Sequence, residues 1–205
     1  LAKRLRIPDD YFTLSQSLAY QYYNLNNYYT GLFPFGDGSS NNLSYTVALS
    51  RNNTFTNPIF PLGGSEFVLS ARFSLPYSLW NGVDYANLGD LEKFQDDDGN
   101  PDPAKIEQEK FKWLEFYKIK FKGSWYTRLF DKLVLRTHTE FGFLGAFNND
   151  RGVIPFDRFF LGGDGMSQYA MDGRETISLR GYPNQSLSSQ DGSTIYNRFS
   201  LELRY

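Results

Sequence analysis

The stretch FYKIKFKGSWY, residues 116–126, alternates apolar and polar side chains with a period of two. Its apolar positions are Tyr117, Ile119, Phe121, Gly123 and Trp125. Its polar positions are Lys118, Lys120, Lys122 and Ser124. Because successive side chains of a β-strand point to opposite faces, this stretch predicts a strand with one apolar face and one basic face.

Five more segments show the same alternation, which predicts six strands at residues 11–23, 43–51, 66–75, 116–126, 133–146 and 194–205. The connections between them are long at 24–42, 76–115 and 147–193, and shorter at 52–65 and 127–132. Long loops on one rim and shorter turns on the other are typical of transmembrane barrels, whose strands need about 9 to 11 residues to cross a bilayer. The predicted fold class is therefore all-β, an antiparallel transmembrane β-barrel with long extracellular loops.

The two faces of these strands have different expected environments. The apolar face, with Leu135 and Phe141, is expected to meet lipid, and the polar face, with Thr46 and Ser70, is expected to line a water-filled lumen. The lysines of residues 116–126 would belong to that lumen as ordinary mixed charge rather than as a specific anion site. Six strands do not close a transmembrane barrel, which needs about eight or more. We therefore expect a six-strand sector of a larger barrel, in a chain that continues beyond both ends.

The composition argues against several other classes of function. The chain has 21 basic and 23 acidic residues, a net charge of -2, which disfavours nucleic acid as a partner. It has no cysteine and one histidine, His138, so it offers little material for a zinc site or a catalytic triad. No activated Ser or Thr can be placed beside His138 from the sequence. We expect no enzymatic activity, no metal and no cofactor, and assign His138 to the lumen wall.

The connection 76–115 carries most of the negative charge. From Asp84 to Glu109 there are nine acidic residues against two lysines. Four of its side chains have the alternate spacing of a calcium loop: Asp96, Asp98, Asn100 and Asp102. Pro101 stands where an EF-hand requires glycine, however, which disfavours a calcium site. The segment is therefore predicted to be an exposed, solvated accessory surface.

The connection 147–193 contains two unusual motifs. The first is LGGDG, residues 161–165, with loop glycines Gly162, Gly163 and Gly165. No Lys-Ser/Thr pair follows it, so a phosphate loop is disfavoured, and the glycines predict tight turns or close backbone approach. The second motif consists of Leu179, Arg180, Gly181 and Tyr182.

At these residues the sequence resembles the BamA family of outer-membrane assembly factors, whose sixth extracellular loop carries such an Arg-Gly motif after a Gly-Gly segment. The order GGDG at 162–165, DGRE at 172–175 and LRGY at 179–182 looks most like the Bacteroidetes branch. Residues 60–65, FPLGGS, resemble the family's turn before an outward strand. The acidic connection 76–115 is longer than in proteobacterial relatives.

The resemblance implies a sector of a barrel of about sixteen strands in the bacterial outer membrane, with the periplasmic POTRA domains and the lateral seam outside this chain. It implies a protein that folds and inserts other β-barrel proteins without a bound nucleotide. The implied partners are outer-membrane lipid, nascent β-barrel clients, and accessory lipoproteins and other surface proteins. In the family the loop folds into the lumen, where the motif arginine, here Arg180, pairs with the wall. Glu140 and Glu202 are lumen-facing candidates, although the family's usual acidic partner lies beyond Tyr205.

Three alternatives stay open at this point. A TamA-like protein or a two-partner secretion transporter would share the loop motif and differ mainly in its periplasmic domains. A substrate-specific porin or receptor would have similar strands but little reason for LRGY. An outer-membrane phospholipase or protease would need an Asp/His/Ser arrangement at a barrel rim, for which His138 has no recognisable partner motif.

Overall fold

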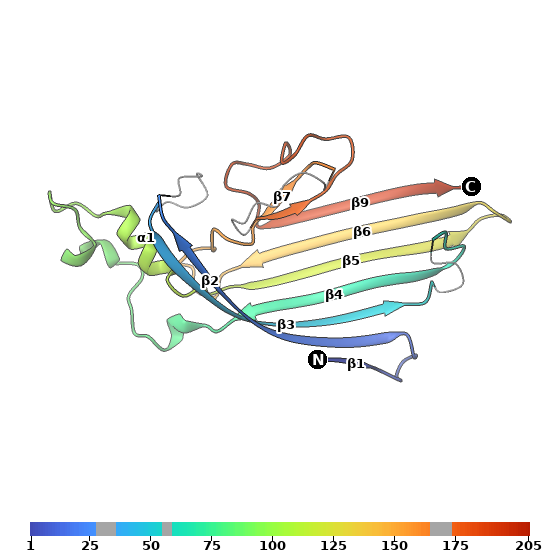
Figure 1. The fold of residues 1–205 in the computed structure, drawn as a ribbon, viewed down its shortest axis with the longest axis horizontal. Coiled ribbons are helices and arrows are strands. Elements are labelled where there is room, and N and C mark those ends of the chain that lie inside the picture. Colours follow the sequence, from blue (N-terminus) through green and yellow to red (C-terminus); the bar gives the residue numbers. More distant parts are fainter. Residues whose placement is uncertain (28–35, 55–58, 165–173) are drawn as a thin grey trace.

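The computed structural model of the chain describes residues 1–27, 36–54, 59–164 and 174–205. Seven strands form one antiparallel sheet in the order β1-β2-β3-β4-β5-β6-β9 (Figure 1). Their bounds are β1 (Ala2–Arg4), β2 (Phe12–Leu25), β3 (Gly38–Asn52), β4 (Gly64–Ser74), β5 (Tyr117–Arg128), β6 (Val134–Gly145) and β9 (Ile195–Arg204). The predicted all-β antiparallel fold is confirmed, and the sheet is an open sector of a barrel. The short strand β1 was not predicted, because three residues are too few to show a period.

Strands β2 and β3 extend further than the alternation predicts. Their pairing continues to Leu25 and Gly38, so residues 24–25 and 38–42 of the predicted loop are strand. Alternation fails there because both faces of β3 are polar at its outer end, where Ser40 and Asn42 are buried. The Asn42 side-chain amide donates to Gln21 Oε1 of β2 at 3.0 Å.

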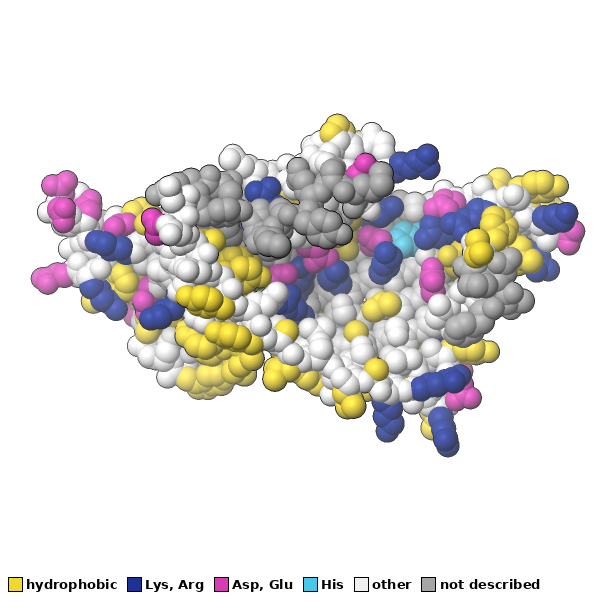
Figure 2. All heavy atoms as spheres, viewed as in Figure 1, with side chains coloured by type: hydrophobic (Ala, Val, Ile, Leu, Met, Phe, Trp, Pro, Cys, Tyr) yellow, Lys and Arg dark blue, Asp and Glu magenta, His cyan; other side chains and the backbone are white. Residues whose placement is uncertain are grey.

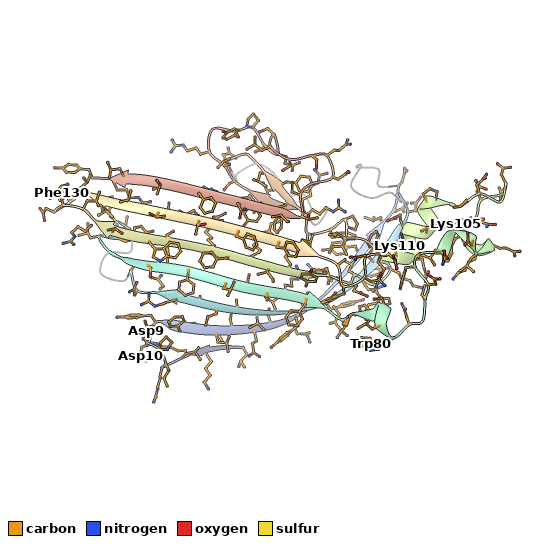
Figure 3. The ribbon with its side chains drawn as sticks, turned by 180° about the vertical axis from the view of Figure 1, so that it is seen from behind. Asp9, Asp10, Trp80, Lys105, Lys110 and Phe130 are labelled. Atoms are coloured by element: carbon orange, nitrogen blue, oxygen red, sulfur yellow. The ribbon has the colours of Figure 1, made fainter. Side chains whose placement is uncertain are left out.

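The polarity of the sheet is inverted relative to a soluble protein. Large apolar side chains on one face are exposed, with Leu18 at 72%, Phe199 at 75% and Leu201 at 73%. On the other face Lys118 and Glu140 are buried. That polar face is hollowed and carries the basic, acidic and histidine side chains (Figure 2), whereas aromatic rings project from the reverse face (Figure 3). A soluble sheet would bury the apolar face, so the apolar face meets lipid and the polar face is the inner wall.

Residues 76–115, here called the cap, are folded and not merely solvated. They contain η1 (Tyr77–Leu79), η2 (Leu88–Asp90), η3 (Glu92–Phe94) and the helix α1 (Pro103–Phe111). Three cap residues, Tyr85, Leu88 and Phe94, form a buried cluster. The expectation of an exposed segment holds for most of its acidic residues but not for these apolar residues, which form a core of their own. That the connection is accessory stays a prediction.

Several acidic residues of the cap serve as local hydrogen-bond acceptors. Asp96 accepts from the backbone N–H groups of Asp98 and Asn100, which closes a turn. Asp102 caps α1 by accepting from Ala104 N, and Pro103 follows at the first helical position. Among the described residues no group of three His, Cys, Asp or Glu side chains could hold a metal ion. No described helix has the length and apolarity needed to cross a bilayer.

The cap is attached both to the sheet and to the connection 147–193. Asn41 of β3 donates its N–H to Lys112 O at 2.9 Å, and Leu114 N donates to Asn41 O at 2.8 Å. Arg151 pairs with Glu115 at 2.7 Å, and both side chains are almost completely buried. Arg151 also donates to the backbone oxygens of Lys110 and Trp113. Because a buried pair is costly to break, these contacts fix the base of the cap.

The inverted polarity predicts unequal costs of adding charge to the two faces. We expect Phe141→Arg, on the lipid face of β6, to destabilise the folded barrel by about 2 to 4 kcal/mol, since a guanidinium would enter hydrocarbon. Ser17→Arg, on the exposed inner face of β2, is the matched control and should change stability little. Folding titrations of the full-length protein in lipid vesicles measure both. An equal loss of folding stability in the two variants would refute the assignment of one face to lipid and the other to the lumen.

Candidate functional site on the inner face of the sheet

The connection 147–193 is here called the inner loop, and its described residues, 147–164 and 174–193, fold back over the inner face (Figure 1). It contains two short parallel strands, β7 (Phe159–Leu161) and β8 (Glu175–Ile177). Phe159 packs on Tyr196 of β9 with ring centroids 4.7 Å apart. Gly142 of β6 makes this approach possible, because a Cβ there would lie 2.2 Å from the Tyr196 ring and 2.8 Å from Phe159. An apolar contact thus brings the loop onto the wall.

Two carboxylates of the inner loop pair with bases of the wall. Asp157 contacts Arg72 of β4 at 3.2 Å and Lys118 of β5 at 3.3 Å. Glu175 contacts Lys118 at 2.5 Å and also pairs with Lys120. Lys118 additionally donates to the backbone oxygen of Asp157 at 2.6 Å. We call these five residues the loop anchor.

The loop anchor is protected from water. The side chain of Lys118 is only 4% exposed, and those of Asp157 and Glu175 are 16% and 25% exposed. Burial alone would raise the pKa of Glu175, but the ammonium groups of Lys118 and Lys120 outweigh burial and lower that pKa below its usual 4.5. Glu175 is therefore ionised at neutral pH, and both charges of the pair are present.

The loop anchor corrects the expectation for the basic stripe. Lys118 and Lys120 are not merely part of a hydrated lumen, because specific carboxylates neutralise them. Lys122 fits the original expectation better, since its side chain is 68% exposed and lies 3.4 Å from Glu140. Glu175 ends the DGRE motif, which was the only sequence signal for the anchor. Nothing local to Asp157 indicates its partners.

The Gly-Gly segment lies directly against the LRGY motif. Gly163 donates its N–H to Tyr182 O at 3.0 Å, and Leu179 donates to Gly163 O at 2.9 Å. A Cβ on Gly162 would lie 2.4 Å from Pro183 O, and one on Gly163 would lie 1.9 Å from Asn184 Oδ1. Both glycines also have positive φ, of 120° and 98°. They hold the motif by close backbone approach. Gly165 lies outside the described residues.

Arg180 itself is exposed, and its side chain makes no hydrogen bond or ion pair with a residue that the structure describes. Glu140 and Glu202 do line the inner wall, but they pair with other bases. Arg198 and Lys122 lie near Glu140, and Arg136 contacts Glu202 at 2.5 Å. The structure therefore does not bring Arg180 to either acid within this sector. That Arg180 latches the loop remains a prediction.

The histidine has partners that the sequence did not reveal. Ser124 Oγ lies 2.8 Å from His138 Nδ1, and His138 Nε2 lies 2.9 Å from Glu140 Oε1. Arg136 also donates to Ser124 Oγ at 3.2 Å. A nucleophile must be open to its substrate, whereas Ser124 is only 2% exposed. This line of hydrogen bonds is best explained as satisfaction of polar groups along the wall.

Comparison with known proteins matches residues 4–205 to the Omp85 superfamily domain. The chain belongs to the Omp85 superfamily. The structure is similar to that of BamA from Haemophilus ducreyi lacking POTRA domains 1-3, with a TM-score of 0.57 and 20% identity. The alignment covers 96% of this chain and 34% of that protein, so the chain spans about a third of its length. A comparison with curated proteins returned no match.

These findings confirm the resemblance to a BamA-like barrel sector. The likeness in structure concerns the fold alone at this level of identity. Membership of the Omp85 superfamily favours barrel assembly or secretion over a substrate-specific porin or receptor. It is equally compatible with a TamA-like protein or a two-partner secretion transporter.

The loop anchor predicts energetic coupling between Lys118 and Glu175. We expect Lys118→Met and Glu175→Gln each to make residues 147–193 more accessible to protease, because each deprives a buried charge of one of its partners. The double variant should lose less of the free energy that keeps the inner loop closed than the two single variants lose in sum. The expected coupling energy is about 1 to 3 kcal/mol. Proteolysis rates of the full-length protein in vesicles give these free energies. Lys122→Met, on the same strand but exposed, is the control, and additive effects would contradict the anchor.

The lowered pKa of Glu175 predicts that the inner loop loosens in acid. A carboxyl group with a folded-state pKa below 4.5 stabilises the folded state above pH 4.5. That stabilisation is lost as the pH falls through the lower folded value. Protease accessibility of the loop should therefore rise below pH 4.5, and Glu175→Gln should be accessible already at neutral pH. An unchanged pH profile in that variant would contradict the assignment.

Proposed function

We propose that this chain is part of the outer-membrane barrel of an assembly factor that folds and inserts other β-barrel proteins into the bacterial outer membrane. The main observation behind the proposal is that Asp157 and Glu175 anchor the inner loop to the wall. The same loop carries the LRGY motif at residues 179–182. Superfamily membership and the likeness to BamA support it. Its partners would be outer-membrane lipid, nascent barrel proteins, accessory lipoproteins and other surface proteins. No catalytic group or cofactor is part of the proposal.

In this proposal the inner loop is held at two points. The loop anchor attaches it to β4 and β5, and Arg180 reaches an acidic group on strands beyond Tyr205. A guanidinium suits this role, because its rigid fork of donors can bind a carboxylate with two parallel hydrogen bonds. Gly181, with φ of 92° and open space around it, leaves the arginine free to project from the loop. The exposure of Arg180 within this sector agrees with a partner outside it.

A TamA-like protein or a two-partner secretion transporter is the second candidate, supported by the same superfamily match. The two candidates differ in the periplasmic domains before the barrel. The number of POTRA repeats in the full-length protein and the proteins that accumulate on its depletion distinguish them. Accumulation of many unassembled barrel proteins supports the assembly factor, whereas retention of one secreted protein supports the transporter.

Arg180→Ala tests the second attachment point. We expect a membrane-inserted barrel whose residues 147–193 are more accessible to external proteinase K and whose client barrels accumulate unassembled. Arg180→Lys should restore function only in part, because a point charge cannot reproduce the two-donor geometry. Arg128→Ala, at an exposed position on the opposite rim, is the control. Wild-type protection and wild-type client insertion in Arg180→Ala would reject the latch.

A further inference from the structure

The cap and the residue that precedes it, Leu75, expose several large apolar side chains next to the lipid face of the sheet. Their exposed fractions are 45% for Leu75, 74% for Leu79, 65% for Trp80 and 40% for Trp113. We call these four residues the foot. Leu79 and Trp80 belong to the cap segment that immediately follows β4, and Figure 3 shows Trp80 beside the end of that strand, away from Lys105 and Lys110 of α1. Such a cluster in an otherwise polar segment points to an apolar partner.

Strand register places the foot in line with the lipid face. Phe73 of β4 pairs with Tyr45 on that face, so Leu75 continues the same row of side chains. Trp113 forms a bridge with Asn41, which lies on the same face of β3. Tyr20, exposed on the lipid face of β2, donates its hydroxyl to Asn41 Oδ1 at 2.7 Å. The foot is therefore continuous with the surface that meets lipid.

The dimensions of a bilayer set the depth of the foot. The apolar band of an outer-membrane barrel is about 25 Å tall. A strand rising about 3.3 Å per residue with a tilt of about 40° crosses it in roughly ten residues. On β4 such a span reaches from Ser65 to Leu75. Leu79 and Trp80 then lie at the outer interface, where tryptophan is favoured. Phe130, 73% exposed in the turn after β5, lies at the opposite rim.

A small cavity with a basic side chain adjoins the foot. It has a volume of about 250 Å³ and is lined by aromatic rings, including Tyr77 and Trp80, together with Asn81, Glu109 and Lys112. Lys112 is exposed and forms no ion pair with a residue that the structure describes. An ammonium group beside aromatic rings at an interface suits the phosphate of a lipid head group.

We propose that the cap binds the outer leaflet through the foot, with Lys112 placed against lipid phosphate. This interaction goes beyond the proposed function. Charge supports the orientation, because the exposed acidic tip at Asp97 and Asp98 is repelled by anionic head groups while Lys112 is attracted. The membrane holds one side of the cap and β3 holds the other, so the acidic tip projects outward.

Fluorescence quenching in vesicles tests the depth of the foot. Single-cysteine versions of the full-length protein carry an environment-sensitive nitrobenzoxadiazole label at Leu79→Cys or, as a matched control, at Leu91→Cys. Leu91 is 49% exposed in the same cap but lies between η2 and η3. The vesicles contain phosphatidylcholine, phosphatidylglycerol and a lipid with a shallow doxyl quencher. We expect the Leu79 label to lose most of its emission and the Leu91 label to keep it. Equal, water-like emission from both labels in a correctly folded barrel overturns the proposal.

A charge reversal tests the head-group contact separately. Lys112→Glu in the Leu79→Cys protein should reduce quenching in vesicles with phosphatidylglycerol more than in vesicles of phosphatidylcholine alone, because only the first adds net negative charge. Lys105→Glu, on the exposed side of α1, is the control and should have little effect. A reduction that is the same in both kinds of vesicle, or the same for both lysines, overturns the role of Lys112.

Discussion

The arrangement of the inner face depends on one buried cation, the ammonium group of Lys118. An isolated charge with a side-chain exposure of 4% would be very costly, so it must be neutralised. The sheet supplies no carboxylate that pairs with it among the described residues, and its recorded partners, Asp157 and Glu175, both come from the inner loop. The same lysine also binds the backbone of Asp157 and lies over the ring of Phe159 at 4.6 Å. The same contacts therefore attach the inner loop to the wall and neutralise the buried charge of Lys118.

The inverted polarity of the sheet explains why the loop anchor is effective. Water would normally weaken ion pairs, but the loop covers the wall at the anchor while lipid surrounds the outer face. Lys122, further along the same strand, shows the contrast, because it is exposed and its nearest carboxylate also serves His138. The anchor is thus a local feature of the covered region and not a property of the whole basic stripe.

The cap and the inner loop share a second buried pair, Arg151 with Glu115. Glu115 also accepts from the backbone and hydroxyl groups of Ser78 at 2.8 and 2.7 Å. The apolar cluster that surrounds these contacts includes Phe111 of α1, Phe116 and Phe156. The described parts of the cap and of the inner loop therefore pack together through these contacts.

Period-two alternation by itself predicted six of the seven strands of the sheet and the facing of their side chains, because side-chain direction in a strand depends on sequence position. It failed at the outer end of β3, where polar residues occupy both faces. Helix α1 was missed although Asp102 and Pro103 are a local start signal, because the acidic run was interpreted as solvated. Only the tertiary structure decided the partners of Lys118, since Asp157 and Glu175 lie far along the chain from it. It also placed Ser124 beside His138 and left Arg180 exposed. Pairing across a sheet and a folded loop depends on three-dimensional register, which no local pattern in the sequence encodes.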